Sequence, residues 1–83
     1  MGPRWPFNAV VARLADVFVD RAVPEDPAFR ELLANIHMFG QLIPVDVVPS
    51  GQGYRVIDGA RRVLALRRLG AQCVEVRVLE ARL

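Results

Sequence analysis

The chain has 83 residues, enough for one small domain, and its single cysteine excludes an intramolecular disulfide, which suits a cytoplasmic protein. One histidine without a Cys/His cluster argues against a structural zinc, and no apolar run approaches the roughly 20 residues of a membrane span. The net charge is only +2, yet all 11 basic residues are arginines, and four of them fall between residues 61 and 68.

The first third of the chain predicts an arm, a strand and a loop. Residues 1–13 are expected to form a loosely packed or interface arm, because Pro3 and Pro6 keep the start extended. Within this arm, residues 8–13 fit either a helix or a strand. Residues 14–19 alternate in the manner of a strand, and residues 20–26 indicate a loop before Pro27.

Residues 27–39 carry a clear helix pattern. Asp26 suits the N-cap, Pro27 the first helical position and Gly40 the C-terminal cap. Apolar residues recur between them at helical spacing, which predicts an amphipathic helix with one buried stripe. The stripe consists of Phe29, Leu32, Leu33, Ile36 and Phe39.

The second half of the chain predicts a hairpin, a helix and a final strand. Residues 42–48 and 54–57 are strands joined by a turn at 49–53, and a helix runs from about residue 59 to 69. Residues 73–79 alternate with period two, and Cys73 at their start is expected to be buried. The order β-α-β-β-α-β predicts an α+β fold, a small mixed sheet packed by two or three helices, with residues 1–83 as one domain. Beyond the stripe, the expected core is Val45, Val47, Val56, Val63, Leu66, Val74, Val76 and Val78.

The turn into the second helix has the composition of a phosphate site. A helix N-terminus presents unpaired backbone N–H groups and the positive end of the helix dipole. Gly59 has no side chain to hinder a ligand, and Arg61 and Arg62 can each fork onto phosphate oxygens. Both arginines oppose the dipole, by about 0.3–1 kcal/mol each, unless an anion is present. Asp58 is expected to cap this helix, with a metal or hydroxyl ligand as the alternative.

Other polar side chains have simpler interpretations. Arg67 and Arg68 lie in mid-helix and are expected on a solvated face, and His37 is expected at the border of the core. The sequence offers no nucleophile beside a base, no Gly-Lys-Ser phosphate loop and no usefully spaced carboxylate pair. It therefore predicts neither catalytic residues nor a metal site within the protein.

These elements together resemble the ParB/sulfiredoxin superfamily, and above all the ParB-like N-terminal nucleotide-binding domain. The resemblance spans residues 14–79 and rests on the segments 40–45 and 54–62, the second of which is similar to a Gly-Glu-Arg-Arg box that opens a helix. It implies that nucleotide phosphates lie at this box and that the nucleoside end lies at Gly40 and Pro44, with Mg²⁺ accompanying a triphosphate. The predicted phosphate site comprises Asp58, Gly59, Ala60, Arg61 and Arg62.

The chain departs from the family pattern at three places. Ala60 stands where ParB proteins have Glu, and Ile43 where they usually have Gln. Residues 20–27 lack the Asn-Pro-x-Gln-Pro-Arg arm of the family. Ala60 also occupies the position of the sulfiredoxin nucleophilic cysteine, which excludes sulfiredoxin chemistry, and hydrolysis of a nucleoside triphosphate is implied by the resemblance alone.

We therefore expect a ParB-like module that binds a phosphorylated ligand, above all a nucleoside triphosphate, with a regulatory or partner-binding role. One alternative is a module that binds nucleic-acid backbone through its arginines. The other is a degenerate ParB fold that serves as a dimerisation or adaptor domain. A hydrophobic content of 53%, with Trp5 and Phe7 near the start, predicts a homodimer or a protein partner rather than a membrane.

Overall fold

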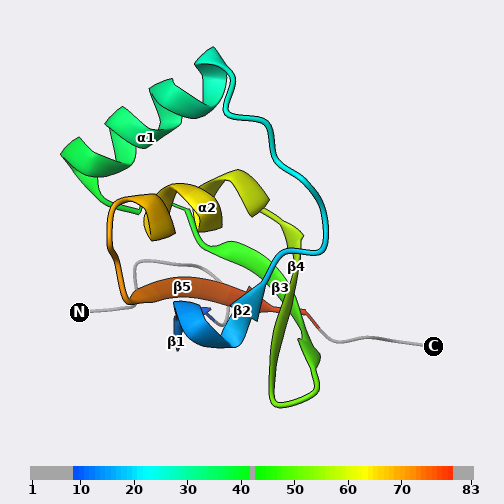
Figure 1. Ribbon diagram of the computed structural model, residues 1–83. Coiled ribbons are helices and arrows are strands. Elements are labelled where there is room, and N and C mark those ends of the chain that lie inside the picture. The colour runs from blue at the N-terminus through cyan, green and yellow to red at the C-terminus, as the bar shows by residue number, and fades with distance from the viewer. Residues whose placement is uncertain (1–8, 42, 80–83) are drawn as a thin grey trace, which may run out of the picture.

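The computed structural model describes residues 9–41 and 43–79, which form a five-stranded sheet and two α-helices (Figure 1). The arm residues Trp5 and Phe7 lie outside the described residues, so the dimer that they suggest stays a prediction. Within the described residues, no helix is long and apolar enough to cross a membrane. In chain order the elements are β1 (Ala9–Arg13), the 3-10 turn η1 (Leu14–Asp16), β2 (Val17–Phe18), α1 (Pro27–Phe39), β3 (Val45–Ser50), β4 (Gly53–Asp58), α2 (Ala60–Arg68) and β5 (Cys73–Val78).

The sheet is mixed and has the order β1-β5-β3-β4-β2, which confirms the predicted α+β class. The central strand β3 runs parallel to β5 and antiparallel to β4, as the predicted hairpin requires. Figure 1 shows both helices on one side of the sheet, with α2 between the sheet and α1. This middle position explains why α2 buries Ala60, Val63, Ala65 and Leu66 although two arginine pairs interrupt its sequence.

The core lies between this helix layer and the sheet. Alternate residues of the central strands point into it, so that Val45, Val47 and Val76 are completely buried. The remaining buried residues are Ala12, Leu14, Val17, Phe29, Ile36, Val56, Ala60, Val63, Ala65, Leu66 and Val74, while Leu32, Leu33 and Val78 pack partly buried at the margin.

The predicted strand at residues 14–19 is confirmed only at Val17–Phe18, which form β2, whereas Leu14–Asp16 form the turn η1. Residues 9–13 form β1, which pairs with β5 at one edge of the sheet. The next strand, β2, pairs with β4 at the other edge, and one continuous strand could not lie at both edges. The turn η1 makes this change, and its Leu14 N–H donates to the carbonyl of Gln72 at 2.8 Å. Gly53 permits the crossing, because a Cβ there would lie 2.2 Å from the Asp16 carbonyl oxygen.

The predicted caps of α1 are confirmed, but one end of its buried stripe is not. The Asp26 carboxylate accepts a hydrogen bond from the Phe29 N–H at 2.9 Å, and Gly40 closes the helix at φ +77°. Phe39, however, is 62% exposed. Since α1 is the outer layer and packs chiefly on α2, none of the described elements covers the ring at its last turn.

We expect Ile36→Ala to lower the free energy of unfolding by about 2–4 kcal/mol, and Leu33→Ala to cost less. Ile36 is only 8% exposed, whereas Leu33 is partly buried at the edge of the core. Urea unfolding of both variants measures the two losses. An Ile36→Ala midpoint equal to that of the wild type would contradict the orientation of α1 described here.

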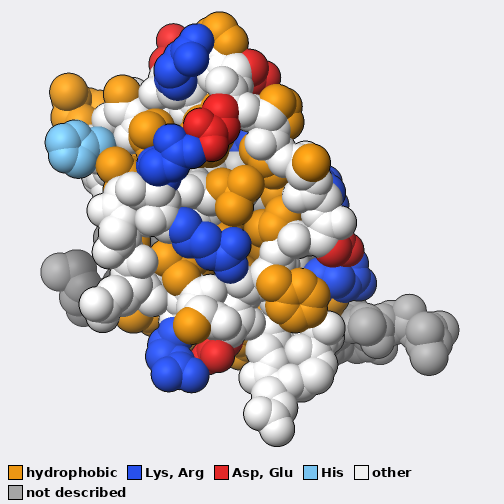
Figure 2. Space-filling model, viewed as in Figure 1, with side chains coloured by type: hydrophobic (Ala, Val, Ile, Leu, Met, Phe, Trp, Pro, Cys, Tyr) orange, Lys and Arg blue, Asp and Glu red, His pale blue; other side chains and the backbone are white. Residues whose placement is uncertain are grey.

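The arginines of the surface are dispersed and mostly paired with acidic side chains. On the face shown in Figure 2 they are separated by hydrophobic side chains and several lie beside acidic ones. The pairs are Arg13 with Asp16, Arg55 with Asp20, Arg61 with Asp26, Arg68 with Glu25 and Arg77 with Asp46. Because neighbouring opposite charges screen one another, these arginines do not add up to one strongly positive surface.

Candidate functional site

The turn between β4 and α2 is built around Gly59. Its φ of +110° belongs to the left-handed region, and a Cβ there would lie 3.1 and 3.2 Å from the two Val45 methyls. The same Cβ would lie 2.9 Å from Nη1 of Arg62, so this guanidinium packs directly over the glycine. Gly59 thus allows both the turn and the close approach of Arg62 to the helix N-terminus.

The prediction that Asp58 caps α2 is wrong. Gly59 occupies the N-cap position, and among the described residues no side chain caps the helix. The Asp58 side chain is exposed and makes no hydrogen bond or ion pair within residues 9–41 and 43–79. The left-handed turn at Gly59 shifts the cap by one residue, and the described part of the chain provides no side-chain cap for the first-turn N–H groups of α2.

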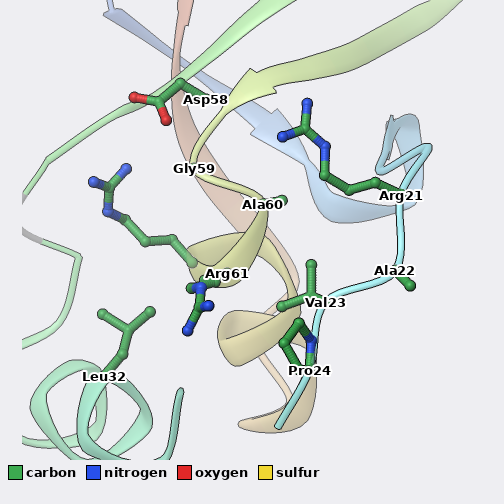
Figure 3. A pocket seen from close by; sticks show the side chains of 10 residues that line it. Arg21, Ala22, Val23, Pro24, Leu32, Asp58, Gly59, Ala60 and Arg61 are labelled. Carbon is green, nitrogen blue, oxygen red and sulfur yellow. The ribbon is translucent and has the colours of Figure 1, made fainter. Parts of the chain in front are cut away.

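A cavity of about 410 Å³ opens at this helix N-terminus (Figure 3). All five residues of the predicted phosphate site line it, while Leu32 of α1 and the connection from β2 to α1 form its other walls. Figure 3 shows Arg21 extending from that connection toward the Asp58-Gly59 turn. The lining residues are Arg21, Ala22, Val23, Pro24, Leu32, Asp58, Gly59, Ala60, Arg61 and Arg62.

Three arginines and one carboxylate line this cavity, but the arginines differ in how they are engaged. Arg61 donates to both oxygens of Asp26, at 3.1 and 3.5 Å. Arg21 lies 4.0 Å from the carboxylate of its neighbour Asp20, a loose contact. Arg62 makes no hydrogen bond or ion pair to any residue in the described part of the chain. An anion in the cavity would therefore find the Arg62 guanidinium available.

Asp26 links the two helices, since it caps α1 and also binds Arg61 of α2. The hydrogen bond from the Phe29 N–H, and then the Arg61 guanidinium, lower the pKa of the Asp26 carboxyl from its ordinary value. Asp26 thereby fixes the position of Arg61 at the wall of the cavity.

This lowered pKa predicts a pH-dependent contribution of Asp26 to stability. The contribution is present in full above the ordinary pKa of 3.8 and is lost as the pH falls through the lower pKa of the folded state. Asp26→Asn keeps a residue suited to the cap but removes the charge. We expect wild type to be more stable than this variant at neutral pH, with the difference closing toward about pH 2 in urea unfolding. A difference independent of pH would contradict the Asp26–Arg61 pair.

The two residues predicted for the nucleoside end line separate cavities that share two residues, Ile43 and Arg62. Gly40 lines a second cavity of about 360 Å³, and Pro44 a third of about 190 Å³. Arg62 borders both of these and the first cavity as well. The structure therefore places the predicted phosphate and nucleoside residues around Arg62.

Arg67 and Arg68 lie outside these cavities and have structural partners. Arg67 donates to the backbone carbonyls of Leu14 and Val17, which holds η1 and the start of β2 against α2. Arg68 binds Glu25, and its guanidinium lies 6.0 Å from the centre of the Phe29 ring. Arg67 and Arg68 are therefore close to Arg61 and Arg62 in the sequence but are not part of the same site.

Two other sequence interpretations are wrong. Cys73 is exposed rather than buried, because it shares the outer face of β5 with Glu75 and Arg77. His37 is exposed on α1 rather than at the border of the core. Among the described residues, no three His, Cys, Asp or Glu side chains are grouped so that they could hold a metal ion.

Sequence reasoning missed Arg21 as a residue of the site. It lies in a loop without periodicity, and only the fold brings that loop beside the N-terminus of α2. The one available signal is its basic side chain in a segment rich in proline and acidic residues, which by itself does not indicate a site.

Comparisons with known proteins agree with this architecture. The C-terminally truncated chromosome-partitioning protein ParB of Caulobacter crescentus, complexed with CTP-gamma-S, superimposes with a TM-score of 0.78 at 24% identity. The match covers 90% of this chain but only 46% of the ParB chain. Sulfiredoxin of Arabidopsis thaliana gives 0.76 at 20% identity, over 89% of this chain and 86% of its own.

A free serine kinase in complex with AMP gives a TM-score of 0.79 at 17% identity, over 94% of this chain and 35% of the kinase. No curated protein matches the sequence. The family model of the ParB N-terminal domain matches residues 11–82, nearly the whole length. The chain belongs to the ParB N-terminal domain family.

Proposed function

We propose that this domain binds a phosphorylated ligand, in the first place a nucleoside triphosphate, with its phosphates at the N-terminus of α2. The observation that carries the proposal is that Arg62, which lies over Gly59, makes no hydrogen bond or ion pair to the described residues, at a helix start whose N-cap is a glycine. The first residues of α2, Arg62 among them, line the same cavity of about 410 Å³. Together they would supply charge-assisted hydrogen bonds to phosphate oxygens.

Arg21 and Arg61 would complete the phosphate site from its two sides. Arg61 is held in place by Asp26, and Arg21 projects from the opposite wall toward the turn. Asp58 is the carboxylate that would face a Mg²⁺ ion carried in by the triphosphate. One carboxylate together with phosphate oxygens and water is a usual environment for Mg²⁺ in nucleotide sites.

The ligands of two similar structures support a nucleotide. CTP-gamma-S is bound in the ParB structure and AMP in the kinase structure. A binding event at the junction of α1, α2 and the β2–α1 connection would stiffen all three segments, since each contributes to the cavity. We therefore assign the domain a regulatory or partner-binding role that depends on the ligand.

The alternative of a nucleic-acid backbone surface receives less support. Backbone binding relies on several free cations along one face. Here most arginines pair with carboxylates, and those on the face in Figure 2 are separated from one another.

A thermal-shift and calorimetric screen with CTP, ATP, GTP, UTP and their diphosphates, with and without Mg²⁺, tests the proposal. Ligand at about 100 times its Kd should add about 2.7 kcal/mol of stability, a clear rise in Tm for so small a domain. The matching nucleosides, which lack phosphate, serve as controls and should give no shift. A flat response to every phosphorylated compound, with a stable dimer in ultracentrifugation, would favour the adaptor alternative instead.

A further inference from the structure

An open groove lies on a different flank of α1 from the candidate nucleotide site. It runs between α1 and the end of α2 and has a volume of about 380 Å³. We refer to it as the α1–α2 groove. It shares no residue with the three cavities around Arg62. Its lining consists of Arg30, Leu33, Ala34, His37 and Leu69.

The floor of the α1–α2 groove is apolar and open to solvent. Leu69, at the C-cap of α2, is 36% exposed, and Leu33 is only partly buried at the margin of the core. Ala34 is exposed and too small to fill the space. Because α1 is the outer layer of the fold, none of the described elements packs over these side chains (Figure 1). An exposed apolar groove of this kind is typical of a surface that binds an amphipathic helix.

Two hydrogen-bond donors, Arg30 and His37, lie along the α1 side of the groove. Both are exposed, and neither side chain makes a hydrogen bond or ion pair with the described residues. They are seven residues apart, which corresponds to about 10 Å along a helix axis. The Arg30 guanidinium and an N–H of the His37 ring can each donate to a carboxylate. Glu31, the acidic residue of α1, does not line the groove.

We propose that the α1–α2 groove binds an amphipathic helix of another protein, in which two carboxylates at positions i and i+7 flank apolar side chains at i+3 and i+4. These four positions lie on one face of a helix. When two helices lie side by side, their equal rise per residue brings such carboxylates opposite Arg30 and His37. The apolar side chains then lie over Ala34.

The occupant is assigned to another protein because this chain offers no such helix. Helix α1 has a single acidic residue, and α2 has none, so neither carries two carboxylates at this spacing. The inference does not rest on nucleotide binding, since the groove and the three cavities around Arg62 have separate linings.

Selection from a library of displayed helical peptides tests the inference. Positions i, i+3, i+4 and i+7 are randomised on a constant helical background. We expect the wild-type domain to enrich Asp or Glu at i and i+7, with apolar residues at i+3 and i+4. Arg30→Glu should instead enrich Lys or Arg at the position that faces residue 30. It should also bind the peptides selected on wild type about tenfold more weakly or worse.

Two further variants separate the contributions of charge and shape. Arg13→Glu makes the same change of charge in β1, at an edge of the sheet and outside the groove, and should keep the wild-type preference. Ala34→Trp leaves the charge unchanged but fills the groove, and should weaken the selected peptides by about tenfold or more. Because Arg13, Arg30 and Ala34 are all exposed, the variants should fold normally, which circular dichroism checks.

Three outcomes would overturn the inference. The first is a selection on wild type that enriches no common sequence, and the second is enrichment of the same sequences by wild type and Arg30→Glu. The third is a dimer of the domain alone, seen in ultracentrifugation and dissociated by Ala34→Trp, since a second copy would then occupy the groove. None of these results changes what the nucleotide screen reports, and a flat nucleotide screen would leave the peptide selection valid.

Discussion

Replacing Arg62 with alanine is expected to weaken nucleoside triphosphate binding by about 10- to 100-fold, because hydrogen bonds between charged groups contribute about 1.5–3 kcal/mol. Arg62 borders all three cavities, and none of its N–H groups donates a hydrogen bond to the described part of the protein. Its loss should therefore reduce affinity with little change in stability. Isothermal titration at fixed ionic strength gives the affinity, and thermal unfolding without ligand gives the stability.

Alanine variants of two other arginines provide the comparisons for this result. Arg61→Ala should reduce affinity less and also lower stability, since Arg61 already binds Asp26. Arg30→Ala is the control, because Arg30 is exposed on α1 and does not line the cavity at Gly59. Arg67 does not serve this purpose, since it hydrogen-bonds to the Leu14 and Val17 carbonyls. Equal losses in the Arg30 and Arg62 variants, with steep salt dependence, would indicate a diffuse nucleic-acid surface instead.

The largest loss of stability is expected from Phe29→Ala, about 3–5 kcal/mol. Phe29 is 2% exposed, and the Arg68 guanidinium lies 6.0 Å from the centre of its ring. Natural domains are stable by only about 5–15 kcal/mol, so this loss is a large share of the free energy of unfolding. Urea unfolding followed by circular dichroism measures the difference.

Phe39→Ala offers a matched comparison on the same helix. Phe39 is 62% exposed, and its removal should change the free energy of unfolding by less than about 0.5 kcal/mol. Similar losses for the two phenylalanines would show that α1 presents a different face to α2 from the one described.

The sequence predicts most elements of this fold because their local signals are strong. Asp26 and Gly40 delimit α1 through cap chemistry, and glycine also marks the hairpin turn, which is shorter than the predicted 49–53 and consists of Gly51 and Gln52. The period of β5 would also have placed Cys73 correctly. Its neighbour Val74 faces the core, so Cys73 must face away, and the expectation of a buried thiol conflicts with the pattern of its own strand.

Other features depend on how the layers assemble. Phe39 has the spacing of a buried residue, but the outer position of α1 leaves its last turn uncovered. For the candidate site, the sequence indicates the turn at 58–62 through its glycine and arginines. It does not indicate Arg21, because Arg21 comes from a distant segment that only the tertiary fold brings beside Arg62.

The order of strands has a consequence for how the domain folds. The first described strand, β1, pairs with the last, β5, and β5 also forms one side of the central strand β3. Contacts between residues so distant in sequence close slowly, because the intervening chain loses its freedom before the contacts form. A nascent chain that has not yet reached Val74 and Val76 must leave Val45 and β1 without their partners. Folding of the sheet is therefore expected to be completed only after β5 has been synthesised.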